Sequence, residues 1–431
     1  MNLISRTIKG LSLGGLGAAV GMASIAVSPA AADAISDFYK GQNMTLFVGS
    51  APGGGYDRYG RLVGRHINRN IPGKPGLVVK NMPGASGLVL AAHMYHKAPK
   101  DGKTIAGVHN TVVTQEILGR GARYKSVGFN WLGSVNQLTT VCIASNKSKV
   151  QSWPDAKKMP FVVGGTGADS SSTNLVPAFL KTLTDGKIKI IKGYPSTSSV
   201  ILAMERGEVD GICGLGWDSL KAQAFDQLRD GKIKVIIQVA KQPHSELKGA
   251  PFVMDMAKSP DDVRVLEFLV ARQYMGRPYL TPPGVPAARV KALRAAFDAT
   301  MLDPKFVKDA KKVRTPLSPI DGKEVTAHIK RLFATPKSVI ARANEASKLK
   351  AGDVSKAKLN WLVVKGTKIE RIKKRNVYFK DGGKTVQAGS RGAKIFVNDK
   401  KVKRKALKAG MMCDITYLGD KDSAKTFKCT K

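Results

Sequence analysis

The chain of 431 residues is 43% hydrophobic, which excludes a disordered protein and predicts two or three domains with sizeable cores. It carries 71 Lys and Arg against 32 Asp and Glu, a formal net charge of +39. Such a charge is typical of proteins that bind nucleic acid or an anionic surface, and the amino-terminal segment argues against nucleic acid.

That segment has the pattern of a secretory signal peptide. Arg6 and Lys9 precede an apolar stretch, Leu11 to Val27, and small residues follow it. We expect cleavage after Ala32 or Ala34; an uncleaved membrane anchor is the alternative, but the apolar stretch is short for a bilayer span. No later stretch is long and apolar enough to span a bilayer. The mature protein is therefore expected in the periplasm, where nucleic acid is a poor candidate partner.

Between residues 44 and 253, short apolar runs alternate with helix-like segments, which indicates an α/β fold. Strands are predicted at residues 44–49, 77–81, 104–108, 131–135, 140–144, 160–164, 188–191, 209–213 and 233–239. Helices are predicted at residues 56–69, 87–96, 112–118, 153–158, 171–184, 197–206 and 217–229. Further helices follow at residues 261–270, 286–301, 304–312 and 322–347, joined by proline-rich turns such as residues 279–286.

The composition changes near Gly352. Residues 353–431 hold 22 Lys and Arg against 7 Asp and Glu, a net charge of +15. Turn residues separate short strands predicted at residues 361–364, 376–380, 394–398, 413–418 and 426–429. This pattern predicts a separate, small, basic all-β domain.

The four cysteines suit an oxidising compartment. Cys413 and Cys429 flank a segment with a turn-like centre, so a hairpin would place their sulfurs on facing strands and a disulfide is predicted. Cys142 and Cys213 either pair or remain buried thiols. None of the four has the spacing of a zinc site.

Four polar, glycine-containing loops follow predicted strands, each at the junction with the next helix. They span residues 51–57, 81–87, 165–172 and 192–197. In open α/β sheets, ligands bind beyond the carboxyl ends of the strands, where backbone N–H groups and helix amino termini face a crevice. The loops are therefore expected to converge on one solute, although each alone is compatible with an ordinary turn.

These loops fit none of the common nucleotide or catalytic motifs. Gly55 is followed by Tyr56 rather than Lys, which excludes a P-loop, and Arg58 stands where a dinucleotide fingerprint needs its third glycine. His93 and His96 lack a nearby carboxylate, so a packed or solvated pair is favoured over a metal site. We expect no catalytic residue, metal site or cofactor, and a binding protein rather than an enzyme.

Together, several motifs resemble the Bug-type solute receptors of tripartite tricarboxylate transporters. They are GSAPGGG at residues 49–55, NMPGASG at 81–87, APKDGKT at 98–104 and the stretch 192–210. The resemblance covers about residues 40–345. It implies an α/β, two-lobed clamshell of the type II periplasmic-binding-protein class, which closes on a small carboxylate and delivers it to a membrane permease.

The resemblance also implies that loop backbone and ordered water hold the carboxylate, without a charged partner. The first jaw would comprise Pro52, Gly53, Gly54, Gly55 and Tyr56, with Asp57 and Ser86 as further candidates. The second lobe would contribute Thr166, Gly167, Ser170, Gly193, Tyr194 and Ser196. The sequence departs from the family pattern after Asp210, where Trp217 and Asp218 become candidates for the solute-side wall. Trp217 is equally compatible with a core anchor.

The predicted domains are a signal peptide at residues 1–32, a first lobe at 35–140 plus 245–350, a second lobe at 141–244 and the basic β domain at 353–431. The basic domain is expected either to adhere to anionic envelope polymer or lipid, or to be a solvated surface. Three alternative functions remain open: a receptor coupled to a membrane sensor, an envelope tether, and an exported hydrolase. The hydrolase would use Asp57 or a serine of residues 170–172, but lacks an identifiable base.

Overall fold

The computed structural model describes residues 29–50, 54–167, 169, 171–359, 361–373, 376–390, 393–420 and 422–430. Most of the predicted signal peptide lies outside these residues, as do the predicted ligand residues Pro52, Gly53 and Ser170. The first described element is helix α1 (Pro29–Tyr39). Within the described ranges, no helix has the length and apolar character needed to cross a membrane.

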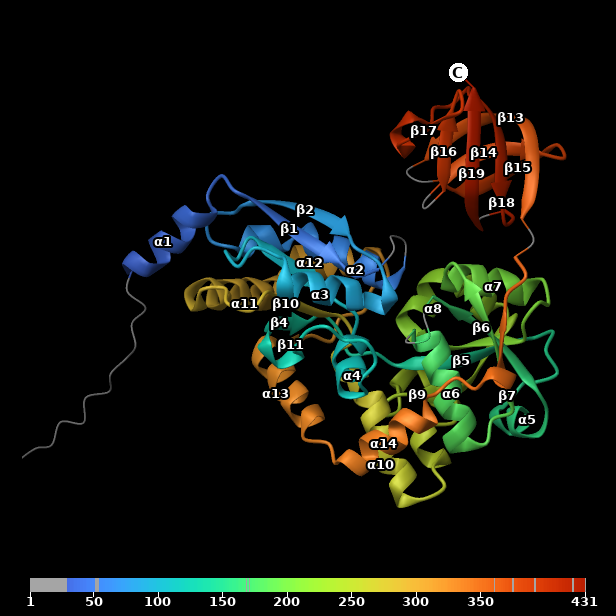
Figure 1. Cartoon of the computed structure of the whole chain (residues 1–431), viewed down its shortest axis with the longest axis horizontal. Coiled ribbons are helices and arrows are strands. Elements are labelled where there is room, and N and C mark those ends of the chain that lie inside the picture. Colours follow the sequence, from blue (N-terminus) through green and yellow to red (C-terminus); the bar gives the residue numbers. More distant parts are fainter. Residues whose placement is uncertain are drawn as a thin grey trace, which may run out of the picture.

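Two mixed sheets with helices packed around them form the two lobes of an α/β clamshell (Figure 1). The first sheet has the strand order β11-β4-β10-β3-β1-β2. Its strands are β1 (Asn43–Val48), β2 (Gly76–Asn81), β3 (Thr104–Gly107), β4 (Asn130–Ser134), β10 (Pro278–Thr281) and β11 (Ile320–Asp321). We refer to this sheet and its covering helices as the first lobe.

Helices of the first lobe include α2 (Gly55–Gly64), α3 (Leu88–His96), α4 (Thr111–Ile117), α11 (Ala287–Leu302), α12 (Pro304–Lys312) and α13 (Gly322–Phe333). Helix α2 buries Tyr59, Leu62 and Val63 against the sheet. Its Gly60 and Gly64 allow this close approach, because a Cβ at either position would collide with a valine side chain of the sheet. The apolar spacing that predicted this helix therefore also identifies its buried face.

The second sheet has the order β12-β7-β6-β8-β5-β9. Its strands are β5 (Thr140–Ser145), β6 (Phe161–Thr166), β7 (Ile188–Tyr194), β8 (Gly211–Gly216), β9 (Ile233–Val239) and β12 (Val354–Lys356). Its helices are α5 (Trp153–Lys158), α6 (Ser172–Thr184), α7 (Thr197–Glu205), α8 (Trp217–Gln223) and α9 (Phe225–Arg229). We refer to this sheet and these helices as the second lobe.

The predicted turn at residues 279–286 is partly wrong, because its first residues belong to strand β10. Pro278 begins this strand, where a missing N–H is tolerated, and Tyr279 and Leu280 are buried. Strand β10 runs antiparallel between β3 and β4. The chain thus returns to the centre of the first sheet after forming the second.

Two predicted helices are each broken in the structure. The segment 217–229 divides into α8 and α9 at Ala224, whose φ of −138° and ψ of 38° are not helical. The segment 322–347 divides into α13 and α14 (Lys337–Ala346), because Pro336 cannot continue a helix and instead precedes α14. Helix α14 packs on α10 (Pro260–Ala271) and also contacts α6 of the second lobe. The lobe boundaries given by sequence analysis stay predictions.

Cys142 and Cys213 form a disulfide between the neighbouring strands β5 and β8, so the pairing left open by sequence analysis is resolved. The bridge closes a loop with a sequence separation of 71 residues. We expect the double variant Cys142→Ala, Cys213→Ala to lose about 4 kcal/mol of unfolding free energy, because the unfolded chain regains loop entropy. Urea denaturation of the oxidised protein measures this loss. Unchanged stability of the second lobe would contradict it.

The carboxyl-terminal residues form an all-β region with a third sheet, whose strand order is β15-β14-β13-β18-β19-β16-β17. We call it the C-terminal sheet. Its strands are β13 (Leu362–Lys373), β14 (Asn376–Asp381), β15 (Lys384–Gly389), β16 (Lys394–Val397), β17 (Lys400–Val402), β18 (Met412–Tyr417) and β19 (Asp422–Thr430). A further pairing between β15 and β19 closes five of the strands into a ring around a core of their own.

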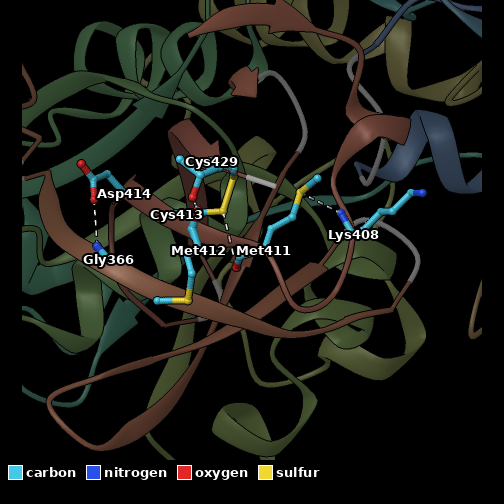
Figure 2. Close-up of a disulfide and its surroundings, with 8 residues drawn as sticks. Gly366, Lys408, Met411, Met412, Cys413, Asp414 and Cys429 are labelled. Carbon is cyan, nitrogen blue, oxygen red and sulfur yellow. Dashed lines mark hydrogen bonds between the residues drawn. A yellow bond between two sulfur atoms is a disulfide. The ribbon is translucent and has the colours of Figure 1, made fainter. Parts of the chain in front are cut away.

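Cys413 and Cys429 lie directly opposite each other on β18 and β19 and form the predicted disulfide (Figure 2). The neighbouring Asp414 accepts a hydrogen bond of 2.8 Å from the backbone N–H of Gly366, on the adjacent strand β13. The disulfide therefore joins two strands that are already held in register by the sheet. Sequence analysis identified this pair because its hairpin is local, with a separation of 16 residues.

Candidate functional site

A cleft of about 790 Å³ lies between the two lobes, where strands of both sheets end. All four polar loops predicted from the sequence contribute to it. Its lining from the first lobe includes Ser50, Gly54, Gly55, Tyr56, Asn81, Ser86, His109, Asn110 and Arg277. Its lining from the second lobe includes Thr166, Gly167, Ser171, Ser172, Thr173, Pro195, Ser196, Thr197, Gly216 and Ser219.

Of the fifteen predicted ligand residues the structure describes twelve, and it brings seven of these to this cleft. Those found in its lining are Gly54, Gly55, Tyr56, Ser86, Thr166, Gly167 and Ser196. Helix α2 begins at Gly55, and α7 begins after Ser196, whose hydroxyl caps the helix by accepting a 3.1 Å hydrogen bond from the N–H of Ser199. Helix amino termini from both lobes therefore open at the cleft, an arrangement suited to an anionic ligand.

Asp57 is buried and supports the first loop instead of facing the cleft. Its carboxylate pairs with Arg61 at 2.9 Å and accepts a 2.8 Å hydrogen bond from the side-chain amide of Asn81. The same amide donates to the backbone carbonyl of Ser50, at the start of the loop. Asp57 and Asn81 together fix the base of the glycine-rich loop.

Two predicted residues of the 192–197 loop also point elsewhere. The Tyr194 ring is buried in the core of the second lobe, and its hydroxyl donates to Glu208 at 3.3 Å. Gly193 has a φ of 110° and is exposed, with no atom near the position of an added Cβ. Gly193 lies within strand β7, where the pairing with β6 skips it between Lys192 and Tyr194, and its positive φ permits this bulge.

Trp217 serves as a core anchor, the second of the two interpretations of this residue. It is buried, and its indole N–H donates to Glu246 at 2.6 Å. Asp218 is buried behind the cleft wall, where its carboxylate accepts from the N–H of Ser219 and pairs with Arg277 at 3.4 Å. Neither Trp217 nor Asp218 belongs to the lining of the cleft.

Arg277 brings a positive charge to the cleft and was not predicted as a ligand residue from the sequence. Arg277 lies just before β10 in the first lobe, so its pair with Asp218 of helix α8 links the two lobes. Its guanidinium carbon lies 4.4 Å from the centre of the Tyr56 ring. Its Nη1 donates to the Gly276 carbonyl, and its buried Nε has no hydrogen-bond partner in the described part of the chain. Burial acts to lower the pKa of Arg277, but Asp218 and nearby tyrosines outweigh it and raise that pKa.

The Arg277 guanidinium, the Tyr56 ring and the His109 ring form a stack at the first-lobe wall. The Tyr56 and His109 rings are parallel within 7°, with centroids 4.0 Å apart. The Tyr56 hydroxyl is held by Asn110, through the side-chain carbonyl and the backbone N–H, each at 3.1 Å. Burial, with a smaller contribution from Arg277, lowers the pKa of His109 to about 3. The stack thus presents one fixed positive charge to the cleft and keeps the imidazole neutral.

A second buried arginine lies behind this wall. Arg272 is 1% exposed, and burial lowers its pKa to about 10, opposed by the interaction with Tyr56. None of its three guanidinium nitrogens has a hydrogen-bond partner among the residues that the structure describes. Gln115 and Gln273, also buried, carry side-chain atoms without such partners. The protein therefore places two buried arginines, and with them positive charge, on the Tyr56 side of the cleft.

The two lobes come into close contact at Gly55. A Cβ on Gly55 would lie 2.8 Å from the Ser219 hydroxyl of the second lobe and 2.9 Å from Nη2 of Arg277. Both atoms are ends of side chains that can move, so a methyl group alone could be accommodated. We therefore expect Gly55→Trp, whose ring is too large for such small movements, to hold the lobes apart, and small-angle scattering should show a larger radius of gyration than for the wild type. Gly249→Trp is the matched control, because Gly249 is exposed and an added Cβ there meets no described atom within 4 Å. Equal scattering of Gly55→Trp and the control would contradict the expectation.

Solved bacterial solute-binding proteins share this architecture. A TctC solute binding protein from Polaromonas aligns with a TM-score of 0.51 at 19% identity, over 70% of this chain and 99% of its own. The periplasmic binding protein BugD aligns with a TM-score of 0.56 at 17% identity, over 74% and 100%. MatC from Rhodopseudomonas palustris, solved with bound malate, aligns with a TM-score of 0.53 at 18% identity, over 71% and 99%. This chain has the fold of the TctC and Bug solute-binding proteins.

No protein-family model and no curated protein sequence matches the chain. The Bug-type fold predicted from the glycine loops is nevertheless confirmed by these structural alignments. The three proteins align over nearly their whole lengths but cover at most 74% of this chain. About a quarter of this chain therefore lies outside the shared fold.

Proposed function

We propose that the protein is an extracytoplasmic solute-binding protein that captures a small carboxylate between its lobes and delivers it to a permease of the tripartite tricarboxylate type. The observation that carries this proposal is the Arg277 guanidinium, set in a cleft between amide-bearing loops of both lobes. The Bug-type fold and the predicted signal peptide support it. Adhesion of residues 353–431 to anionic envelope polymer stays a separate prediction.

Arg277 is suited to receive one carboxylate of the solute. Among the residues that the structure describes, its Nε has no hydrogen-bond partner, and its Nη2 is held only by the long 3.4 Å contact to Asp218. These two nitrogens form one edge of the guanidinium, and a carboxylate accepts two parallel hydrogen bonds from such an edge. Binding of this kind would satisfy the buried Nε and correct the expectation that no charged group contacts the ligand.

The remaining contacts would come from both lobes. The first lobe offers the loop around Gly54 and Gly55, and the second lobe offers the hydroxyls of Thr166, Ser196 and Ser219. A solute that touches both lobes is bound more tightly by the closed form than by the open form, so it shifts the population toward closure. The permease would then recognise the closed form. This mechanism requires no chemical turnover.

A thermal-shift screen of residues 33–431 tests the proposal. The panel comprises malate, other di- and tricarboxylates, aromatic acids and amino acids, each at millimolar concentration. An acid present at 100 times its dissociation constant stabilises the folded protein by about 2.7 kcal/mol, which raises the melting temperature by several degrees. We expect at least one carboxylate to do so. A panel in which no acid shifts the melting temperature would overturn the proposed function.

A further inference from the structure

We propose that the C-terminal sheet forms a third wall of the solute cleft and helps to select the solute. This inference rests on the proposed function of the cleft. Two residues of the sheet, Gly389 and Ser423, lie in the lining together with Arg277 and Ser196. Gly389 on β15 and Ser423 on β19 are direct partners in the parallel pairing that closes the ring of strands. The closing seam of the C-terminal sheet therefore faces the cleft.

A buried hydrogen bond fixes this seam to the second lobe. The Ser199 hydroxyl of helix α7 donates to the Asp422 carboxylate of β19 at 2.8 Å. Ser199 is 1% exposed and Asp422 is 6% exposed, so solvent is excluded from the contact. A hydrogen bond to a buried carboxylate is among the stronger kinds in proteins. In Figure 1 the C-terminal sheet accordingly lies next to α7, over the end of the second lobe.

The same hydrogen bond leads directly to the cleft. The Ser199 hydroxyl lies 3.0 Å from the hydroxyl of Ser196, which lines the cleft and caps α7. A chain of hydrogen bonds thus runs from Asp422 through Ser199 to Ser196. Displacement of the C-terminal sheet would remove Gly389 and Ser423 from the cleft lining. It would also break the hydrogen bond that orients the hydroxyl groups of Ser199 and Ser196.

The connection between the second lobe and the C-terminal sheet is also short. Strand β12 pairs with β7 of the second lobe, and the N–H of Ala357 continues this contact by donating to the carbonyl of Lys192. Ala357 and Leu359 pack on the core of the second lobe, and β13 begins at Leu362. So short a tether gives the docking contact a high effective concentration. We therefore expect the C-terminal sheet to be docked on the second lobe in solution.

One experiment enlarges a side chain in the wall. We expect Ser423→Phe, which adds bulk to the cleft lining from the C-terminal sheet, to weaken binding of the strongest acid of the panel at least tenfold by titration calorimetry. The matched control is Thr385→Phe at the exposed, opposite end of β15, which should bind as the wild type does. Circular dichroism melts of both variants verify that each is folded. Wild-type affinity of folded Ser423→Phe would overturn the inference.

A second experiment tests docking without any ligand and so separates this inference from the proposed function. Ser199→Asp places a carboxylate against Asp422, and we expect it to release the C-terminal sheet and to increase the radius of gyration in small-angle scattering. The control Ser198→Asp adds the same charge at the neighbouring exposed position and should leave scattering unchanged. A radius of gyration for Ser199→Asp equal to that of the control would overturn the docking contact, whether or not any acid binds.

Discussion

Arg277→Met is expected to weaken solute binding at least a hundredfold. The substitution keeps an unbranched apolar side chain but removes the guanidinium edge that receives the carboxylate. Losing one partner of a buried, hydrogen-bonded charge pair typically costs about 3–5 kcal/mol, and each 1.4 kcal/mol corresponds to a factor of ten. Titration calorimetry with the acid that gives the largest thermal shift measures the change. Arg277→Lys should keep part of the affinity, because it retains the charge without the planar fork.

The Asp218 carboxylate needs its own control in this experiment. Asp218 is only 8% exposed, and in Arg277→Met its carboxylate would remain buried without the guanidinium that pairs with it. The variant is therefore expected to lose stability as well as affinity. The double variant Arg277→Met, Asp218→Asn removes this unpaired charge and should recover stability but not binding. Arg294→Met is a matched control, because Arg294 donates to the carbonyl of Trp131 and lies outside the cleft lining. Restored affinity in the double variant would contradict a direct role of Arg277.

His109 is expected to make the protein sensitive to acid. Burial holds its folded-state pKa at about 3, whereas an unfolded histidine has a pKa of about 6.5. Below pH 6.5 the unfolded chain therefore binds a proton that the folded protein does not. The contribution of neutral His109 to the free energy of unfolding is fully present above pH 6.5. It is lost as the pH falls toward 3, at up to about 1.4 kcal/mol per pH unit. Protonation is unfavourable because the ring is buried, because its Nε2 has no hydrogen-bond partner among the described residues, and because Arg277 lies nearby.

The variant His109→Phe tests this effect. Phenylalanine keeps a flat ring to stack on Tyr56 but cannot take up a proton. The free energy of unfolding is measured in urea between pH 4 and pH 7.5. As the pH falls, it should decrease less steeply for the variant, with a slope smaller by the contribution of one proton. His328, whose pKa burial also lowers, contributes equally to both proteins and cancels in the comparison. Parallel pH curves for the variant and the wild type would contradict the assignment.

The regular α/β part of the fold was predictable because its signals are local. Strands such as Ile233–Val239 are rich in branched apolar residues, and the loops that follow several strands carry glycine and small polar residues. The short strands β10 and β12, of four and three residues, carry too little pattern to be recognised. They exist because neighbouring strands supply their hydrogen-bond partners, which is information from distant parts of the chain.

The candidate site was predictable in its loops but not in its charge. The loops around Gly55, Ser86, Thr166 and Ser196 follow strand ends, and the sheet brings such ends together. Arg277 is one of 71 basic residues, and nothing in its local sequence distinguishes it from a solvated side chain. Its function depends on the return of the chain into the first sheet as β10, which sequence analysis did not detect. The position of Ser423 in the cleft lining was also hidden, because it depends on contacts between β19 and helix α7, which are far apart in the sequence.

Strand β12 has a mechanical consequence. Because it is an edge strand of the second sheet, any rotation of the second lobe carries the C-terminal sheet with it. Strands β16 and β17 lie at one margin of that sheet, outside the ring of five. A fluorophore on β16 or β17 would therefore move farther per degree of rotation of the second lobe than one placed near the axis of that rotation. The attached sheet therefore reports the angle of the second lobe, and this angle can be followed by a label that does not touch the solute cleft.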